Sequence, residues 1–160
     1  MRWTYEKGLH DLGSGAYAWL APDGSWGWSN AGLVVDGEKS LLVDTLFDLR
    51  LTQEMLDAMR DAEPGAASRI GTLVNTHANG DHCHGNQLVA GAEIIASAAA
   101  AEEMTELPPE AMAGLMEAMA EDASPLGQFF RHCFGRFEFR GIRHTPPTRT
   151  FEGEMSVTVG

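Results

Sequence analysis

A stretch at positions 75–86, NTHANGDHCHGN, gathers three histidines, an aspartate and a cysteine within twelve residues. It overlaps the end of the segment RIGTLVNTH, in which the apolar residues do not alternate cleanly with polar ones. Strands that are covered on both faces have this pattern. The polar stretch is therefore expected to begin where a buried strand ends, as in a layered α/β fold.

The side chains of this stretch are those that bind metal ions. Zinc takes imidazole nitrogen, carboxylate oxygen or thiolate at about 2 Å, and a catalytic zinc keeps one position open for water. His77, Asp81 and His82 lie within six residues. Gly80 and Gly85 are expected to let the loop turn these side chains toward one point. The spacing predicts a metal site that needs no distant part of the chain.

Two other interpretations of nearby residues remain open. Cys83, between two histidines, could act as a thiol nucleophile, although an isolated cysteine is more often a small buried apolar residue. The same two interpretations apply to Cys133 beside His132. The dipeptide Asn79-Gly80 favours a turn with positive φ, which would explain the glycine but not the flanking ligands.

Periodicity elsewhere supports an α/β order of elements in a single domain, residues 1–160. Asp36-Gly37 marks a tight turn between two strands, Thr52 is the expected N-cap of the first helix, and Pro64-Gly65 ends it. Ser97 is the expected cap of an alanine-rich helix. We expect strands at 17–20, 32–35, 40–45, 69–77 and 91–97, helices at 51–62, 97–104, 108–123 and 124–139, and a hairpin at 150–159 with its turn at 152–154.

The composition narrows the range of partners and locations. Eleven basic against 23 acidic side chains give a formal charge of −12, which argues against nucleic acid. No apolar run approaches the roughly 20 residues that cross a bilayer, and the N-terminus lacks a secretory signal. Only two cysteines are present, far apart in the sequence. These features predict a cytoplasmic protein with no membrane partner.

The segment VNTHANGDHCHGN resembles the signature of the metallo-β-lactamase-fold superfamily, T-H-x-H-x-D-H after a buried strand. SNAGLVV and SLLVDT are similar to the opening strands of that family. The resemblance implies half or most of an αββα sandwich with a metal site at the strand ends. It places His77 in a first metal position and Asp81 with His82 in a second, with Asp44 supporting the site from behind.

The activity that this resemblance implies is hydrolysis of an ester, thioester, lactone or related bond in a small molecule by metal-activated hydroxide. Asp81 would be catalytic, because it would both bind metal and orient the nucleophile. The cofactor would be one or two zinc ions, with manganese or iron as alternatives. Trp26 and Trp28 would form an aromatic wall for an apolar substrate, or else pack on neighbouring strands.

Two departures from the family pattern bear on this interpretation. Asn79 stands where the family has its second histidine, and an amide oxygen is a weaker zinc ligand than imidazole. His84 would replace that ligand or line the pocket. The chain also ends before the segment that supplies the family's remaining ligands, and His144 precedes that segment. We therefore expect a C-terminally truncated domain whose exposed sheet face is covered by a homo-oligomer or a missing C-terminal half.

Two alternatives to a hydrolase remain open at this stage. One is a catalytically incomplete binding or assembly module with the same fold. The other is a metal-dependent cyclase or lyase that does not hydrolyse its substrate.

Overall fold

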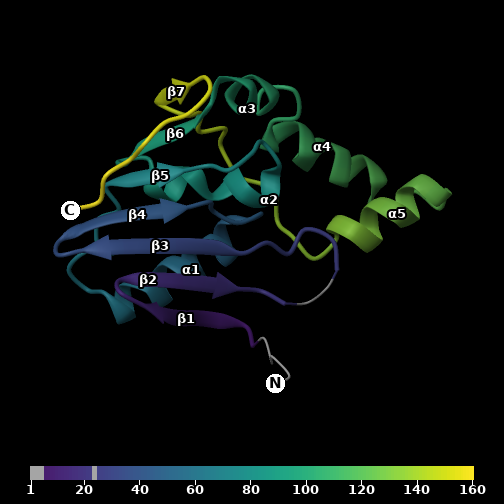
Figure 1. Cartoon of the computed structure of the whole chain (residues 1–160). Helices are drawn as coiled ribbons and strands as arrows, with labels where there is room; N and C mark the ends of the chain where they lie inside the picture. Colours follow the sequence, from purple (N-terminus) through teal and green to yellow (C-terminus); the bar gives the residue numbers. More distant parts are fainter. Residues whose placement is uncertain (1–5, 23–24) are drawn as a thin grey trace.

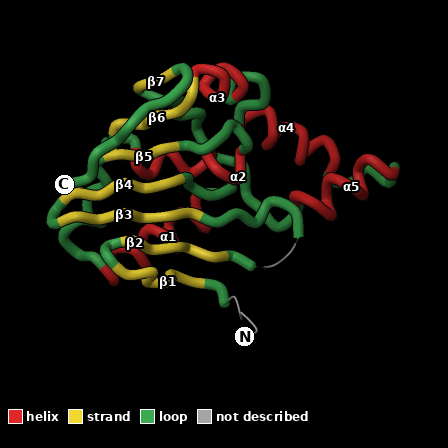
Figure 2. Tube along the Cα trace, viewed as in Figure 1, coloured by secondary structure: helices red, strands yellow, loops and turns green. Residues whose placement is uncertain are grey.

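The computed structural model describes residues 6–22 and 25–160, and these form one mixed sheet in which seven strands lie in chain order (Figures 1 and 2). The strands are β1 (Gly8–Gly13), β2 (Ala16–Leu20), β3 (Ala31–Asp36), β4 (Lys39–Val43), β5 (Thr72–Val74), β6 (Glu93–Ser97) and β7 (Arg149–Phe151). The helices are α1 (Leu49–Ala62), α2 (Gly80–Cys83), α3 (Ala98–Glu103), α4 (Pro109–Met119) and α5 (Pro125–Phe134), with a 3₁₀ helix, η1 (His84–Val89). The α/β prediction is confirmed.

The change of strand direction along the sheet positions the site. Strands β1 to β4 pair antiparallel, whereas β4 to β7 pair parallel. Helix α1 connects β4 to β5 and covers one face of the sheet, behind the strands in Figure 1. The carboxyl ends of β4 and β5 therefore lie side by side, with Val43 opposite Val74. Ligands of open α/β sheets bind at such an edge.

The core lies between the sheet and α1. Leu33, Leu42 and Leu73 are fully buried in the three central strands, and α1 buries Met55 and Met59 against them. A helix that carries apolar residues three and four positions apart presents one such stripe to a sheet. This layer holds β4 and β5 in fixed register and thus fixes the loops that follow them.

Helix α1 begins earlier than its sequence indicates. Its N-cap is Asp48, whose carboxylate accepts a hydrogen bond from the backbone N–H of Leu51. Thr52, the predicted cap, lies inside the helix and is fully buried, and its hydroxyl accepts a hydrogen bond from the N–H of Leu46. The prediction was wrong because both residue types suit an N-cap, and the loop after β4 is shorter than expected. The prediction that Ser97 caps the next helix is confirmed, since its hydroxyl accepts a hydrogen bond from the backbone N–H of Ala100.

The predicted C-terminal hairpin is also wrong. Residues 149–151 form β7, which pairs parallel to β6, and no strand follows among the described residues after 151. The tail instead runs back along the sheet toward the β3–β4 end (Figure 1). In the described part of the chain, no helix has the length and apolarity to cross a membrane.

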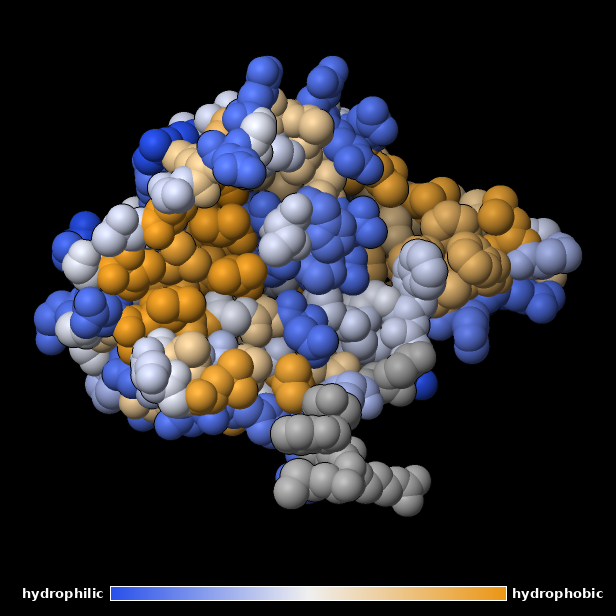
Figure 3. Space-filling view, in the orientation of Figure 1, coloured by the Kyte–Doolittle hydropathy of each residue, from blue (hydrophilic) through white to orange (hydrophobic). Residues whose placement is uncertain are grey.

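The sheet face opposite α1 carries an apolar patch. Figure 3 shows apolar side chains gathered over β3 to β5 on this side. The strand register places Val34 beside Leu41, and Val43 beside Val74, on this face. Val34 is 38% exposed, whereas its neighbour Leu33, on the other face, is fully buried.

Candidate metal centre

The candidate site is built from the loops that follow β4 and β5. Asp44 directly follows β4 and has a φ of 62°, a left-handed conformation that residues other than glycine seldom adopt. Its backbone N–H donates to the carbonyl of Val74, so that the two loops are joined at their bases. This turn directs the Asp44 side chain toward Thr76, His77 and His82.

Asp44 binds the site loop through both carboxylate oxygens. One oxygen accepts a hydrogen bond from the backbone N–H of Thr76, 2.7 Å away. The other accepts hydrogen bonds from the Thr76 hydroxyl at 2.7 Å and from Nδ1 of His82 at 2.9 Å. The residue is only 4% exposed. Charge-assisted hydrogen bonds of this kind hold their donors in a fixed orientation. Asp44 thus fixes the position of Thr76 and of the His82 ring.

These contacts favour one tautomer of each neutral imidazole. A carboxylate only accepts, so Nδ1 of His82 carries a proton, and Nε2 of the neutral ring has the free lone pair. The Thr76 hydroxyl gives its proton to Asp44 and can therefore only accept from Nδ1 of His77, 2.8 Å away. Nε2 of His77 is left with a free lone pair as well. Both rings are in the tautomer that binds a metal through Nε2.

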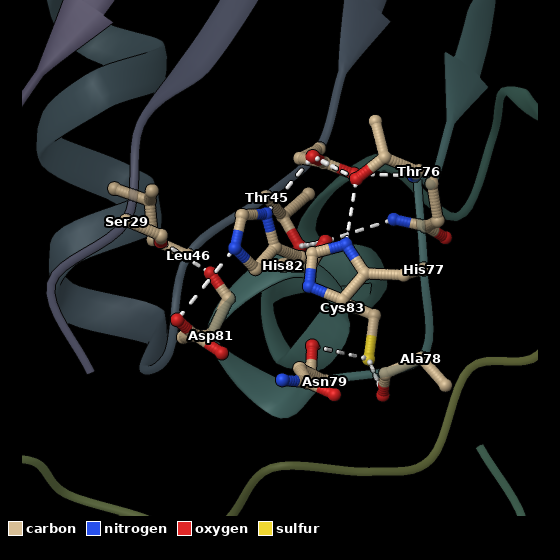
Figure 4. A network of polar contacts seen from close by, with 12 residues as sticks. Ser29, Thr45, Leu46, Thr76, His77, Ala78, Asn79, Asp81, His82 and Cys83 are labelled. Atoms are coloured by element: carbon tan, nitrogen blue, oxygen red, sulfur yellow. Dashed lines mark hydrogen bonds and ion pairs between the residues drawn. The ribbon is translucent and has the colours of Figure 1, made fainter. Parts of the chain in front are cut away.

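The two imidazole rings lie side by side, and Asp81 lies beside His82, as Figure 4 shows. The ring centroids of His77 and His82 are 4.1 Å apart. Atoms of Asp44, His77 and His82 lie within 4.8 Å of one another, which makes them a group that could hold a metal ion. A carboxylate oxygen of Asp81 lies 3.6 Å from Nε2 of His82. Two ligands of one tetrahedral zinc ion, each about 2.0–2.1 Å from it, lie roughly 3.4 Å apart.

The electrostatic environment of His82 favours positive charge. Burial alone would lower its pKa, but the hydrogen bond from Nδ1 to Asp44 and the charges of Asp44 and Asp81 outweigh it. The net effect raises the pKa of His82 above its ordinary value. Two carboxylates that favour a proton on this ring favour a cation beside it for the same reason.

Several residues that fix the loop have no counterpart in the sequence-based predictions. The carbonyl of His82 accepts from the backbone N–H of Thr45 at 3.0 Å and from the amide of Asn75 at 2.9 Å. The Ser29 hydroxyl donates to the carbonyl of Asp81. Asn86, 1% exposed, exchanges hydrogen bonds with Asn75 beneath the loop. The position of Asn75 and Asn86 at the two ends of the histidine-rich stretch is the one sequence feature that could have indicated their role. No sequence feature indicates the role of Ser29.

The glycines of the loop serve a different purpose from the one predicted. Neither Gly80 nor Gly85 has a positive φ, and α2 begins at Gly80 in place of a turn. A Cβ at Gly80 would lie 2.9 Å from the ring of Phe47, and one at Gly85 would lie 2.7 Å from Cβ of Thr52. The two positions need glycine because other groups approach the backbone closely.

We therefore expect Gly85→Ala to lower the free energy of unfolding by about 1–3 kcal/mol, the usual cost of overpacking. Thr52 is fully buried in α1 and has no room to move away. Urea denaturation followed by circular dichroism would measure the change. Gly91→Ala is the matched control, because a Cβ there meets nothing within 4 Å. Equal stability of the two variants would contradict the close approach at Gly85.

Cys83 and His84 are packing residues in this structure. The Cys83 thiol donates to the carbonyls of Ala78 and Asn79 (Figure 4), and burial, with the charges of Asp44 and Asp81, raises its pKa to about 12. A thiol in this state is a poor nucleophile. His84 is 8% exposed and packs against Phe47 and Phe139, with ring centroids 5.4 and 5.9 Å away. It is not in the group of possible metal ligands, but it lines the hollow beside that group, one of the two places expected for it.

The burial of His84 gives the metal-free protein a pH-dependent stability. Burial lowers the pKa of His84 to about 4, whereas an unfolded histidine titrates near 6.5. Its contribution is thus complete above pH 6.5 and is lost as the pH falls from 6.5 to 4, because only the unfolded chain takes up the proton. We expect a loss on the order of 3 kcal/mol over this range, measured by urea denaturation in EDTA. The His84→Leu variant should lack this part of the slope.

A hollow of about 280 Å³ lies beside the candidate metal centre. Asn79, Gly80 and Asp81 form one wall of it, and Asn79 makes no capping hydrogen bond with its side chain. Trp26, 64% exposed, lines the hollow as predicted. Trp28 does not line it and instead packs its ring 5.3 Å from that of Phe137.

Comparison with known proteins identifies the family of the chain. A family model for the metallo-beta-lactamase superfamily matches residues 24–155. A solved metallo beta lactamase from Hirschia baltica is 23% identical, with a TM-score of 0.50 over 61% of this chain and 46% of that one. One from Erythrobacter litoralis, with beta mercaptoethanol in its active site, is 24% identical, with a TM-score of 0.49 over 64% and 45%. The chain thus spans less than half the length of either. A search of curated proteins finds no match.

Proposed function

Because the chain belongs to the metallo-β-lactamase superfamily, we propose that it contributes the metal centre of a hydrolase that cleaves an ester, thioester, lactone or related bond in a small molecule. The observation that carries the proposal is the group formed by Asp44, His77 and His82, with Asp81 beside His82. Two imidazoles present free Nε2 lone pairs, and a carboxylate oxygen lies 3.6 Å from one of them.

The donors present fit a divalent metal ion. His77, His82 and Asp81 would hold it, with Asp44 as the acceptor that orients His82. When bound, such an ion lowers the pKa of a coordinated water and polarises the oxygen of the scissile bond. Two imidazoles and one carboxylate, with a further position open, are a common donor set of catalytic zinc. Zinc is therefore the proposed metal. Asn79, an oxygen donor at the same edge, would suit manganese or iron at a second position.

The protein's own residues then have distinct tasks. The Asp81 carboxylate would both help to hold the metal and accept a hydrogen bond from the attacking water, which would orient that water. The Asp44 carboxylate keeps the proton of His82 on Nδ1 and Nε2 available. The hydrogen bond from Ser29 to the carbonyl of Asp81 holds the backbone that carries this carboxylate in place.

Two measurements test this proposal, first the metal content of the chain and then its turnover of substrates. The purified chain, dialysed against each of zinc, manganese and iron, would be analysed for bound metal, and then assayed with an ester, a thioester and a lactone. We expect at least one equivalent of metal, and hydrolysis that is lost in EDTA. The Asp81→Asn variant should lose turnover, whereas Asp61→Asn, an exposed carboxyl on α1, should retain it. A chain that binds no metal would refute the proposal.

A second candidate is a metal-binding module that is not catalytic by itself. The observation that favours it is the share of the related structures that this chain spans, less than half. Metal binding without turnover of any of the three substrates would support it. A metal-dependent cyclase or lyase would instead give a product that is formed without the addition of water.

We also propose a partner for the apolar sheet face defined above. The face includes Val34 and lies opposite α1 (Figure 3). Either a second copy of the chain or a complementing C-terminal half would cover it. Light scattering would distinguish a dimer from a monomer. The unpaired Cys83 and Cys133 suit a reducing compartment, so that the cytoplasm is the proposed location.

A further inference from the structure

The hollow beside the metal centre has a composition that selects for the charge of what it binds. Its apolar lining comes from four separate parts of the chain: Trp26, Phe47 after β4, Leu107, and the arm formed by α4 and α5. The arm contributes Met112 and Phe134. A volume of about 280 Å³ is close to the lower end of small-molecule sites, roughly 300–1,000 Å³. It suits one aromatic ring with a short chain.

The charged residues that line this hollow are all acidic. Asp81 lines it where it meets the candidate metal centre, next to His82, and Glu103 and Glu106 line it from the segment that includes α3. No lysine or arginine lines it among the described residues. Arg143 and His144 do not line it but line a neighbouring hollow of about 10 Å³, which shares Ala78, His84 and Leu107 with this one. A metal ion would offset the charge of Asp81 but would leave Glu103 and Glu106 unneutralised.

The aromatic lining adds to this preference. Trp26 is 64% exposed, and a cation over an indole face is favoured by roughly 0.5–1 kcal/mol at exposed sites. Glu103 and Glu106 are exposed too, so salt weakens their attraction for a cation. Both effects act in the same direction, toward positive charge and against negative charge.

We propose that this hollow binds the apolar part of a substrate that has no negative charge there, and prefers a cationic to a neutral group and a neutral to an anionic one. The proposal rests on the proposed function, since it assigns the substrate class of that site. It makes esters and lactones of neutral or amine-bearing apolar acids the expected substrates. Repulsion from Glu103 and Glu106 makes substrates with a carboxylate, sulfate or phosphate at this end the weaker binders.

Ligand binding to the metal-free chain tests the preference without catalysis. The tryptophan fluorescence of the chain, to which Trp26 contributes, would be followed during titration with 3-phenylpropylamine, 3-phenylpropanol and 4-phenylbutyrate in EDTA at low salt. We expect the amine to bind about tenfold more tightly than the carboxylate, and the alcohol to lie between them. The Trp26→Phe variant identifies the reporting indole, because its signal change should be lost.

Charge-neutral variants separate the hollow from the general acidity of the protein. In the double variant Glu103→Gln/Glu106→Gln, the difference between amine and carboxylate should fall below about threefold. Glu102→Gln is the matched control, since Glu102 is exposed on the same helix but does not line the hollow. Its preference should equal that of the unmodified chain.

The outcomes distinguish this inference from the proposed function. Equal affinities, tighter binding of the carboxylate, or no binding of any ligand would overturn the inference. Hydrolysis of all three charge types at equal kcat/KM in the metal-loaded chain would overturn it as well, and would leave the hydrolase proposal standing. A charge preference in a chain that hydrolyses nothing would refute the hydrolase alone.

Discussion

Replacing His82 with glutamine is expected to weaken zinc binding by more than about 100-fold, because removing even the partner behind a ligand costs 10–100-fold. Nε2 of His82 is the donor that lies nearest the Asp81 carboxylate, and its tautomer is fixed by Asp44. Glutamine keeps the size of the side chain but supplies a neutral amide oxygen, a weaker ligand for zinc. Competition with a chromophoric chelator at pH 7.5 would measure the affinity.

The control for this variant is His132→Gln, which makes the same change on the exposed side of α5. It should bind zinc as tightly as the unmodified chain. Circular dichroism would show whether each variant is folded. If the folded His82→Gln chain kept its zinc affinity, the assignment of His82 as a ligand would be wrong.

Asp44→Asn should have the second largest effect, a loss of about 10–100-fold in zinc affinity. The Asp44 carboxylate accepts three hydrogen bonds, from the N–H and hydroxyl of Thr76 and from Nδ1 of His82. An amide has one acceptor oxygen, so at least one donor loses its partner. His82 can then rotate or change tautomer, and its Nε2 is no longer held for metal. The chelator competition described for His82 applies here.

A second measurement shows whether Asp44 acts through His82. Asp44 raises the pKa of His82 against the opposing effect of burial. Without the carboxylate, the pKa of His82 in the metal-free protein should therefore fall, which NMR titration of the ring would detect. Asp36→Asn, at an exposed position in the β3–β4 turn, is the control and should leave this pKa unchanged. Weaker zinc binding without a lower pKa would point to a general loss of structure instead.

The sequence predicted the central strands and helices well, for a physical reason. β3 to β6 and α1 carry apolar residues at positions that the core fills, so that periodicity reports them directly. Strand β1, GLHDLG, was missed because its glycines and polar residues lack alternation, and it gains its place by pairing with β2. Strand β7 was assigned to a hairpin because its partner, β6, lies about 50 residues away and no local pattern indicates that pairing.

The candidate site was predictable to the extent that its residues are ligand types. His77, Asp81 and His82 were predicted as ligands because imidazole and carboxylate groups seldom cluster so densely, whereas Asp44 was placed near the site only by the resemblance to the family. Thr76 and Ser29 act through a hydroxyl on a neighbouring carboxylate or carbonyl. Such contacts depend on the relative position of strands far apart in sequence, and no spacing rule reveals them.

The left-handed backbone at Asp44 sets conformational preference against chemistry at one position. Glycine and asparagine adopt this conformation more readily than aspartate, yet neither supplies the negative charge beside His82. The three hydrogen bonds that the buried Asp44 carboxylate accepts offset the cost of this conformation, because glycine would leave all three donors without a partner and asparagine at least one. Selection for heat resistance and selection for metal binding would thus favour the same residue at this position.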